Sequence, residues 1–266
     1  MAIRLPEPDT GRLRKAPLEL AVLQIRYDPQ LRATEAPVAL AFHAALGGPD
    51  GTFPNIDPIS ATSVQFSFGA SAGATAAPIV AESSGVEGWR FSSPDGVWTV
   101  QLTRDFATLQ TTKYETWESF RPHVALLVRA IAEHIGPRIE QRLGLRYVDR
   151  LRMPGLGRPA DWHEYVVPEL LGLAGHQLLG DAVVAAQQQL VLDLGEGGVQ
   201  AGFRHGFLRD PSAITDIQYF LDFDIFRQAG RAFDAENIAV AADRFNTYAL
   251  QLFQASVTPK LLEQLR

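Results

Sequence analysis

Charged and apolar residues alternate along two segments of this chain, and this period of two constrains the fold more than any other feature. In the first segment, residues 142–152, arginines occupy one set of alternate positions and apolar residues the other. The arginines are Arg142, Arg146, Arg150 and Arg152, and the apolar residues are Leu143, Leu145, Tyr147 and Leu151. Because successive side chains of a strand point to opposite faces, the segment predicts a strand with one buried and one polar face. Half-solvated antiparallel sheets show this pattern by default.

A second segment, residues 213–226, carries acids where the first carries arginines. One of its faces is apolar, with Ile217, Tyr219, Leu221, Phe223 and Ile225, and the other is polar, with Asp216, Gln218, Asp222 and Asp224. Rows of opposite sign predict cross-strand pairing on the polar face of one sheet, a face that can also meet a partner. In the alternative interpretation, Arg146 and Arg150 are half-buried in a concave sheet and bind a carboxylate or phosphate.

Long amphipathic helices follow the predicted strands. Apolar residues three or four apart predict one helix from about residue 116 to 135 and another from 234 to the break at Thr258-Pro259. Period-two segments at residues 17–28 and 88–114 precede the first helix, and a hairpin around residues 195–198 precedes the second.

We therefore predict an α+β fold, in which antiparallel β-meanders have long amphipathic helices packed on one face. The chain is expected to form a single α+β domain over residues 17–266, made of two structurally similar halves, about 17–155 and 156–266. Residues 1–16 are expected to be a flexible N-terminal arm. Residues 64–68 predict a strand, followed by a flexible loop at residues 69–77.

Composition narrows the classes of function. The net charge is −6 and the pI about 5.5, so no overall field attracts a phosphate backbone and nucleic acid is an unlikely partner. No cysteine is present, which excludes disulfides and thiolate chemistry. The segment Met1–Leu20 lacks the apolar run of a secretory signal, and no apolar run approaches the roughly 18 residues that span a bilayer. We expect a soluble cytoplasmic protein, and its richness in arginine and alanine is typical of a GC-rich bacterial genome.

Motifs for catalysis and metal binding are missing from the sequence. The histidines lack zinc spacing, and neither a nucleophile elbow nor a phosphate-binding glycine loop is present. Asp222 and Asp224 place two carboxylates on one side of a strand, as a hard cation requires, but no third ligand has a suitable spacing. His205 lies between glycines in a strand, where a ligand can approach closely. We predict no catalytic residue, no metal site and no cofactor, and we name Arg146, Arg150, Arg152, His205, Asp222 and Asp224 as candidate binding residues.

Several stretches resemble, in order and spacing, a sporadically distributed family of prokaryotic proteins of unknown function. They are "PLELAVLQIRYDP", "GWRFSSPDGVWTVQLTRD" followed by "WESF", "LGLRYVDRLRMPG" and "YFLDFDIF", and together they span nearly the whole chain. The family has no established activity, cofactor or catalytic residues, so the resemblance implies no site. Its patchy distribution is compatible with mobile or defence-associated genes.

Three hypotheses for function follow. The first is a non-enzymatic cytoplasmic protein that binds another protein, as an accessory or neutralising partner, through its sheet and helices. The second is a small-molecule or anion-binding protein with a pocket between sheet and helices, in which Arg146 or Arg150 orients an anion. The aromatic residues expected to line that pocket are Trp89, Trp98, Phe203 and Tyr219. The third is a metal- or phosphate-dependent enzyme, which requires Asp222, Asp224, Arg146 and His205 to converge.

Overall fold

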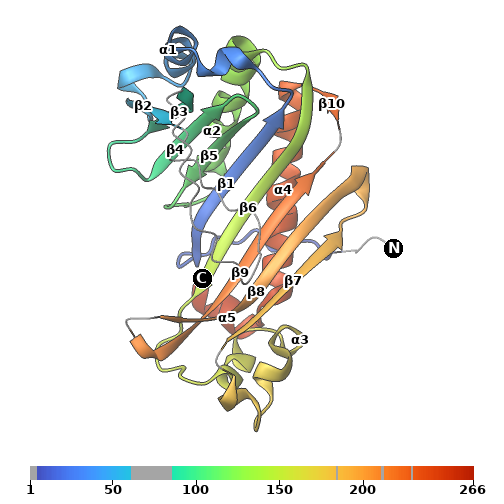
Figure 1. The fold of residues 1–266 in the computed structure, drawn as a ribbon. Coiled ribbons are helices and arrows are strands. Elements are labelled where there is room, and N and C mark those ends of the chain that lie inside the picture. The colour runs from blue at the N-terminus through green and yellow to red at the C-terminus, as the bar shows by residue number, and fades with distance from the viewer. Residues whose placement is uncertain (1–4, 61–85, 184, 211–212, 229) are drawn as a thin grey trace.

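A ten-stranded antiparallel sheet forms the framework of the protein, with helices on one of its faces (Figure 1). The computed structural model describes residues 5–60, 86–183, 185–210, 213–228 and 230–266. The predicted strand at residues 64–68 and the loop at residues 69–77 lie outside the described residues.

The strands belong to two halves that meet in the middle of the sheet. Their order across the sheet is β2-β3-β4-β5-β1-β6-β9-β8-β7, and the short β10 pairs with β6. The first half contributes β1 (Leu18–Tyr27), β2 (Asn55–Ser60), β3 (Val86–Ser92), β4 (Trp98–Thr103) and β5 (Phe106–Thr111). The second half is taken to begin at β6, earlier in the chain than the predicted boundary at about residue 155, and contributes β6 (Ile139–Leu151), β7 (Ala186–Asp193), β8 (Val199–Asp210), β9 (Ala213–Arg227) and β10 (Arg231–Ala232).

The described residues form five α-helices beside the sheet. They are α1 (Ala36–Ala45), α2 (Trp117–Ala130), α3 (Pro168–Leu171), α4 (Ala235–Ser256) and α5 (Pro259–Leu265). Each half therefore consists of an antiparallel run of strands followed by one long helix, α2 or α4. This arrangement confirms the predicted α+β class.

Both long helices begin and end where the sequence predicts. Thr116 caps α2 by accepting a hydrogen bond from the Ser119 amide, and Asp234 caps α4 by accepting one from the Asn237 amide. After α2 the chain continues through a π-helical turn, Ile131–Ile135, and leaves it at Gly136, which adopts the left-handed conformation with φ 64°. Capping side chains thus fix where both long helices start, and Gly136 marks the end of the first.

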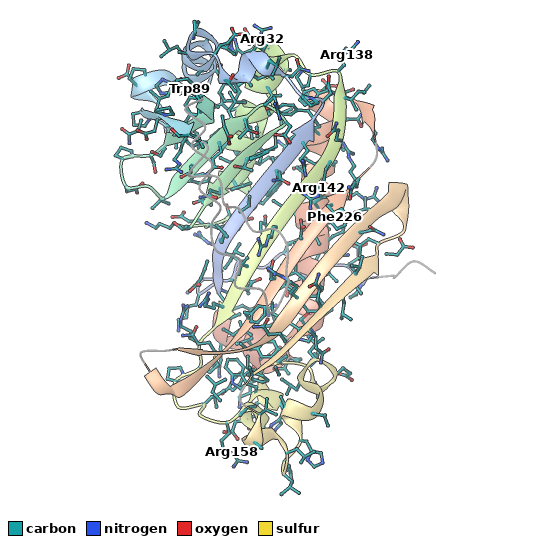
Figure 2. All side chains as sticks on the ribbon, in the orientation of Figure 1. Arg32, Trp89, Arg138, Arg142, Arg158 and Phe226 are labelled. Atoms are coloured by element: carbon teal, nitrogen blue, oxygen red, sulfur yellow. The ribbon has the colours of Figure 1, made fainter. Side chains whose placement is uncertain are left out.

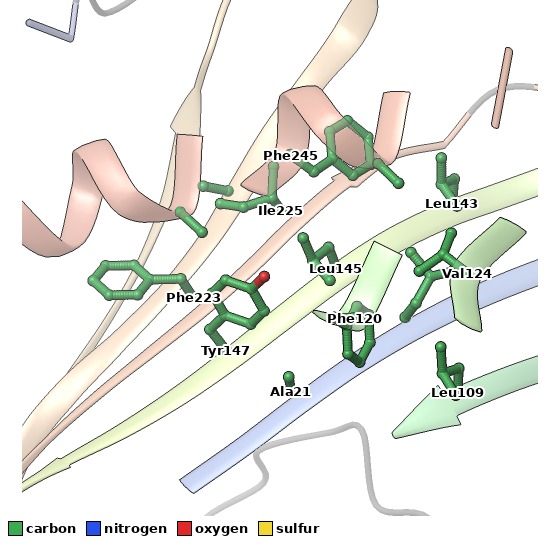
Figure 3. Packing of buried hydrophobic residues seen from close by; sticks show 14 of the residues in the cluster. Ala21, Leu109, Phe120, Val124, Leu143, Leu145, Tyr147, Phe223, Ile225 and Phe245 are labelled. Carbon is green, nitrogen blue, oxygen red and sulfur yellow. The ribbon is translucent and has the colours of Figure 1, made fainter. Parts of the chain in front are cut away.

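The core lies between the helices and the apolar face of the sheet. Figure 3 shows Phe120 and Val124 of α2 and Phe245 of α4 beside the apolar side chains of β6 and β9. On those strands the predicted apolar positions are buried, and Leu145 and Phe223 are fully enclosed. The register of the pairing, which sets Leu145 opposite Ile225 and Tyr147 opposite Phe223, aligns the two apolar rows. One continuous core therefore covers both halves.

The pairing of β1 with β6 joins the two halves into a single sheet, with Leu23 opposite Leu145 at its centre. Residues 5–16, the described part of the predicted arm, lie along α4 and α5. Gln251 donates a hydrogen bond to the Pro6 carbonyl at 2.7 Å, and the Lys15 amide donates one to the Leu265 carbonyl at 3.0 Å. These contacts give the arm a defined position, while its flexibility stays a prediction. No helix among the described residues is long and apolar enough to cross a membrane.

Candidate binding face of the sheet

The face of the sheet turned away from the helices is polar, as the alternation predicts. Figure 2 shows Arg142 and Phe226 near its centre, on β6 and β9. Cross-strand register aligns rows of side chains there, and Arg146 of β6 lies directly opposite Asp224 of β9. We call this surface the polar face.

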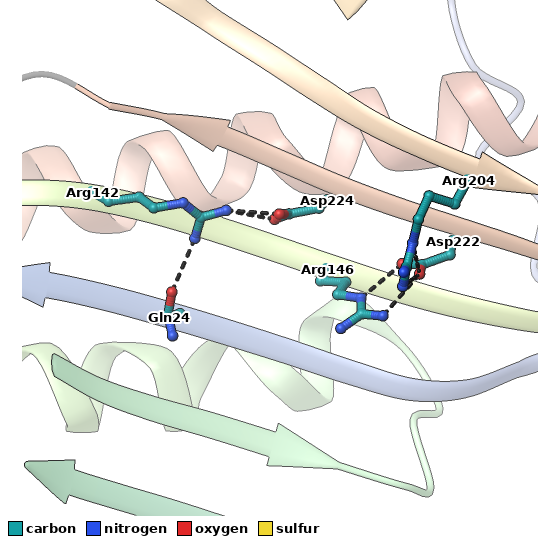
Figure 4. A network of polar contacts seen from close by, with 6 residues as sticks. All are labelled: Gln24, Arg142, Arg146, Arg204, Asp222 and Asp224. Atoms are coloured by element: carbon teal, nitrogen blue, oxygen red, sulfur yellow. Dashed lines mark hydrogen bonds and ion pairs between the residues drawn. The ribbon is translucent and has the colours of Figure 1, made fainter. Parts of the chain in front are cut away.

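Asp222 accepts hydrogen bonds from two arginines on the strands beside it (Figure 4). Arg146 of β6 donates from Nε and Nη2 at 2.7 and 2.8 Å, and Arg204 of β8 donates from Nε at 3.0 Å. The Asp222 side chain is only 4% exposed and that of Arg146 is 20% exposed. Burial alone would lower the pKa of Arg146, but the hydrogen bond and charge of Asp222 outweigh burial and raise it. The two side chains of this bidentate pair are therefore fixed in orientation.

Arg142 is held by three residues. It donates to both carboxylate oxygens of Asp224, at 2.9 and 2.7 Å, and to Oε1 of Gln24 at 3.1 Å. Its guanidinium carbon lies 4.9 Å from the centre of the Phe226 ring. A Cβ at Gly144 would lie 2.4 Å from Nη1 of Arg142, so the glycine leaves room for the guanidinium group.

Arg150 and Arg152 belong to a separate cluster, and the row of arginines is not one continuous surface. Both pair with Glu19, with Arg150 Nε 3.0 Å from Glu19 Oε2. They line a hollow at the end of the sheet together with Leu261 of α5. Arg152 also lies beyond the end of β6 at Leu151, so the alternation of that strand does not place its side chain.

A hollow of about 610 Å³ lies on the polar face, over β1, β5 and β6. Its lining mixes amide, charged and apolar side chains, including Gln24, Gln110, Arg142, Arg146, Val22 and Phe106. Four arginines and three carboxylates form ion pairs in and beside it, namely Arg26 with Asp105, Arg142 with Asp224, and Arg146 and Arg204 with Asp222. The region therefore has a surplus of one positive charge on a chain whose net charge is −6.

The structure places His205 away from the polar face, contrary to its grouping with Asp222 and Arg146. His205 lies opposite Leu221 on the apolar side of β8 and is 1% exposed. Its Nδ1 is 2.7 Å from the Tyr219 hydroxyl, which donates in turn to the Leu170 carbonyl at 3.2 Å. Nδ1 therefore carries the proton, and burial lowers the pKa of this histidine, so it is neutral. The four residues required by the enzyme hypothesis do not converge.

The aromatic residues predicted to line a pocket with Arg146 or Arg150 are also on the opposite side of the sheet. Phe203 stacks on Phe223 with ring centres 4.7 Å apart, and Trp98 stacks on Phe120 of α2 at 5.7 Å. These rings fill the core beneath the helices and do not form a pocket with the arginines. A side chain on one face of a sheet cannot reach a ligand bound on the other.

Of the candidate residues, Arg146, Asp222 and Asp224 come together on the polar face. The sequence prediction missed Arg204 and Gln24, although both alternate with apolar neighbours and so belong to polar rows. Within the described residues, no group of three or more histidine or acidic side chains is arranged to hold a metal ion.

Comparison with known proteins found no matching family model and no similar curated protein. The resemblance to a prokaryotic family therefore stays a prediction, and the function has to be inferred from the site.

Proposed function

We propose that the protein is a non-enzymatic cytoplasmic binding protein that holds an extended segment of a partner protein against its polar face. The observation that carries this proposal is the hollow over β1, β5 and β6, whose arginines are already fixed by carboxylates and an amide. The expected segment presents peptide groups and carboxylate side chains.

The composition of the hollow supports a protein as its occupant. Protein interfaces combine apolar, amide and arginine side chains, and Val22, Phe106, Gln110 and Arg142 supply that mixture here. Side-chain amides can donate to a peptide carbonyl and accept from a peptide N–H group. A pocket for a small molecule is typically enclosed and mostly apolar, whereas the lining of this hollow is rich in amide and charged side chains, and no helix among the described residues covers this face of the sheet (Figure 1).

Fixed side chains reduce the entropy that binding costs. An exposed arginine loses rotamer freedom when a partner binds it, at roughly 0.5–1.5 kcal/mol for each side chain. Arg142 and Arg146 are held before binding, since each makes a bidentate contact with a carboxylate. Their geometry is therefore suited to recognition without rearrangement.

The proposal can be tested by changing the charge of the hollow without removing its ion pairs. We would compare the full-length protein with a Gln24→Glu/Gln110→Glu double variant, which adds two carboxylates to the lining. Each tagged protein would be purified from its native host at low salt, and bound proteins and nucleic acid would be identified. The wild type is expected to retain one stoichiometric protein, and the double variant to lose it.

A matched control is Gln264→Glu, which makes the same chemical change at an exposed position of α5. It should retain the partner at the wild-type ratio. Rebinding of the purified partner, measured by calorimetry with all three proteins, excludes an indirect effect. Equal binding by the double variant, or recovery of nucleic acid in place of a protein, would reject the proposal.

A further inference from the structure

A second cavity, of about 320 Å³, lies on the helix side of the sheet. Its walls come from residues 10–13 and 16–18 of the N-terminal segment, from residues 114–118 at the start of α2, from β6 and from α4. The N-terminal wall is anchored to α4, because Gln254 donates to the Asp9 carbonyl at 2.7 Å and accepts from the Asp9 amide at 2.9 Å. We call this space the Asp149 cavity.

Asp149 of β6 is the polar residue that makes this cavity unusual. It occupies a position on the apolar side of the strand, between Tyr147 and Leu151, and it is only 5% exposed. Among the described residues, no hydrogen bond or ion pair satisfies its side chain, which lines the cavity. A buried carboxyl group without a partner ionises only at a cost of several kcal/mol, so a cation that entered the cavity would stabilise the ionised form.

The tyrosine hydroxyl groups beside Asp149 present hydrogen-bond acceptors to the cavity. The Tyr147 hydroxyl is 2.9 Å from Oδ1 of Asn246 and 3.1 Å from the Tyr114 hydroxyl. Because an amide oxygen can only accept, Tyr147 donates to Asn246, and Tyr114 must then donate to Tyr147. Both phenol protons are used within this chain, and an occupant of the cavity meets the oxygen lone pairs of Tyr114 and Asp149.

Aromatic rings form much of the remaining wall. The rings of Tyr114 and Tyr147 lie 5.2 Å apart, and Trp117 and Phe253 also line the cavity. Trp117 is fixed by a hydrogen bond of 2.8 Å from its Nε1 to Asp243. Aromatic faces attract cations through the negative potential above the ring.

The charges around the cavity favour a cation as well. Three of its lining residues carry carboxyl groups, Glu115, Glu118 and Asp149, against the guanidinium group of Arg12. The start of α2 also forms part of the wall, and free amide groups there would favour an anion. Thr116 and Ser119 already cap that end reciprocally, with each side chain bonded to the backbone of the other. The carboxyl groups therefore decide the charge of the ligand that the cavity favours, and they favour a cation.

We propose that the Asp149 cavity binds a small organic cation, an alkylammonium group that pairs with Asp149 and lies against Tyr114, Trp117 and Tyr147. The proposal is independent of the polar face, since the cavity lies on the other side of the sheet and uses none of the residues of the hollow.

Three probes of similar size and different charge test the proposal on the full-length protein. They are n-butylammonium chloride, n-butanol and sodium butyrate, titrated at pH 8.5 in a calorimeter at constant ionic strength. The ammonium probe is expected to bind at least tenfold more tightly than the alcohol, and the carboxylate probe more weakly than either. Tighter binding of butyrate, or equal binding of butanol and butylammonium, would overturn the proposal.

Two variants test whether Asp149 is the group that binds. Asp149→Asn keeps the shape of the side chain and removes its charge, and should weaken butylammonium binding at least tenfold. Asp57→Asn, the same change at an exposed position of β2, should leave it unchanged. The Gln24→Glu/Gln110→Glu variant should also bind butylammonium normally, which separates this proposal from the proposed function. Unchanged binding by Asp149→Asn would reject the site even if the protein binds amines elsewhere.

Binding should also release a proton. Burial raises the pKa of Asp149 to about 8, so in the free protein at pH 7 the carboxyl is largely protonated and must ionise to pair with a cation. Other ionisable groups around the cavity are those of Arg12, Tyr114, Glu115, Glu118 and Tyr147. Calorimetry at pH 7 in two buffers of different ionisation enthalpy measures the release, and Asp149→Asn should abolish it. Binding without proton release in the wild type would contradict ionisation of Asp149.

Discussion

At the scale of single residues, Asp222 links the polar face together, because one nearly buried carboxylate serves two arginines on different strands. Removing an arginine from this cluster and removing its carboxylate have different consequences for the remaining charges. Loss of Arg146 leaves Asp222 still paired with Arg204, whereas loss of Asp222 removes the one carboxylate that both arginines share.

We expect Asp222→Ala to lower the free energy of unfolding by about 3–5 kcal/mol, the usual cost of breaking a buried ion pair. Arg146→Ala should cost less, about 1–2 kcal/mol, because a hydrogen bond to a charged group is lost but no buried charge is left alone. Urea unfolding of both variants measures the difference. A larger loss for Arg146→Ala would show that Arg204 does not compensate.

Asp149 should make stability depend on pH in the opposite direction to an ordinary salt-bridged carboxylate. Burial, with a smaller contribution from the charge of Asp222, raises its pKa to about 8, whereas the pKa in the unfolded chain is about 4. Between these values the folded protein holds a proton that the unfolded chain releases, so this group's contribution to stability falls as pH rises.

Asp149→Asn removes that dependence, because an amide does not ionise. Its free energy of unfolding, relative to wild type, should increase steadily from pH 4 to pH 8 and stay constant above that. Urea unfolding at one-unit steps of pH measures the trend. A difference that does not change across this range would show that Asp149 has an ordinary pKa in the folded protein.

At the scale of elements, β9 illustrates how one strand serves two environments. Phe223 faces the helices, is fully buried and stacks on Phe203 of β8. Phe220, three residues earlier, lies on the polar face and is partly exposed. Because successive side chains of a strand point to opposite faces, these two chemically identical side chains lie in different environments.

Truncation of the two phenylalanines should therefore have unequal effects. Phe223→Ala removes a core ring and should lower the free energy of unfolding by about 3–5 kcal/mol. Phe220→Ala, the matched control on the same strand, should cost about 1 kcal/mol or less, as expected for a side chain that remains partly solvated. Denaturant midpoints of the two variants give the comparison, and similar losses would mean that the strand register is wrong.

At the scale of the whole molecule, the pairing of β1 with β6 makes one sheet of two halves. The central partners, Leu23 and Leu145, are both fully buried, and the core beneath them contains residues of α2 and α4. Neither half can expose its edge strand without opening the shared core.

We therefore expect the two halves to unfold together. Tryptophan fluorescence, which reports mainly on the first half through Trp89, Trp98 and Trp117, should give the same urea midpoint as far-UV circular dichroism, which reports on both halves. Separate midpoints would show that the halves are independent folding units. A Trp162→Phe variant provides the control, since it confines the fluorescence signal to the first half.

The sequence alone determined the class of the fold and the two faces of its central strands. Alternation requires only local backbone geometry, so Leu145 and Phe223 could be assigned to the core and Arg146 and Asp222 to the polar face before any contact was known. Helix caps such as Thr116 and Asp234 are equally local, since each acts within its own first turn.

Only the tertiary structure decided which residues meet. Strand order and register pair Arg146 and Arg204 with Asp222, move Arg150 and Arg152 to Glu19, and turn His205 toward the helices. Asp149 stands in a row of apolar residues, and its sequence neighbours do not show that α2, α4 and the N-terminal segment leave a cavity beside it. These contacts join residues far apart in the chain, so they depend on how the elements pack and not on the local pattern.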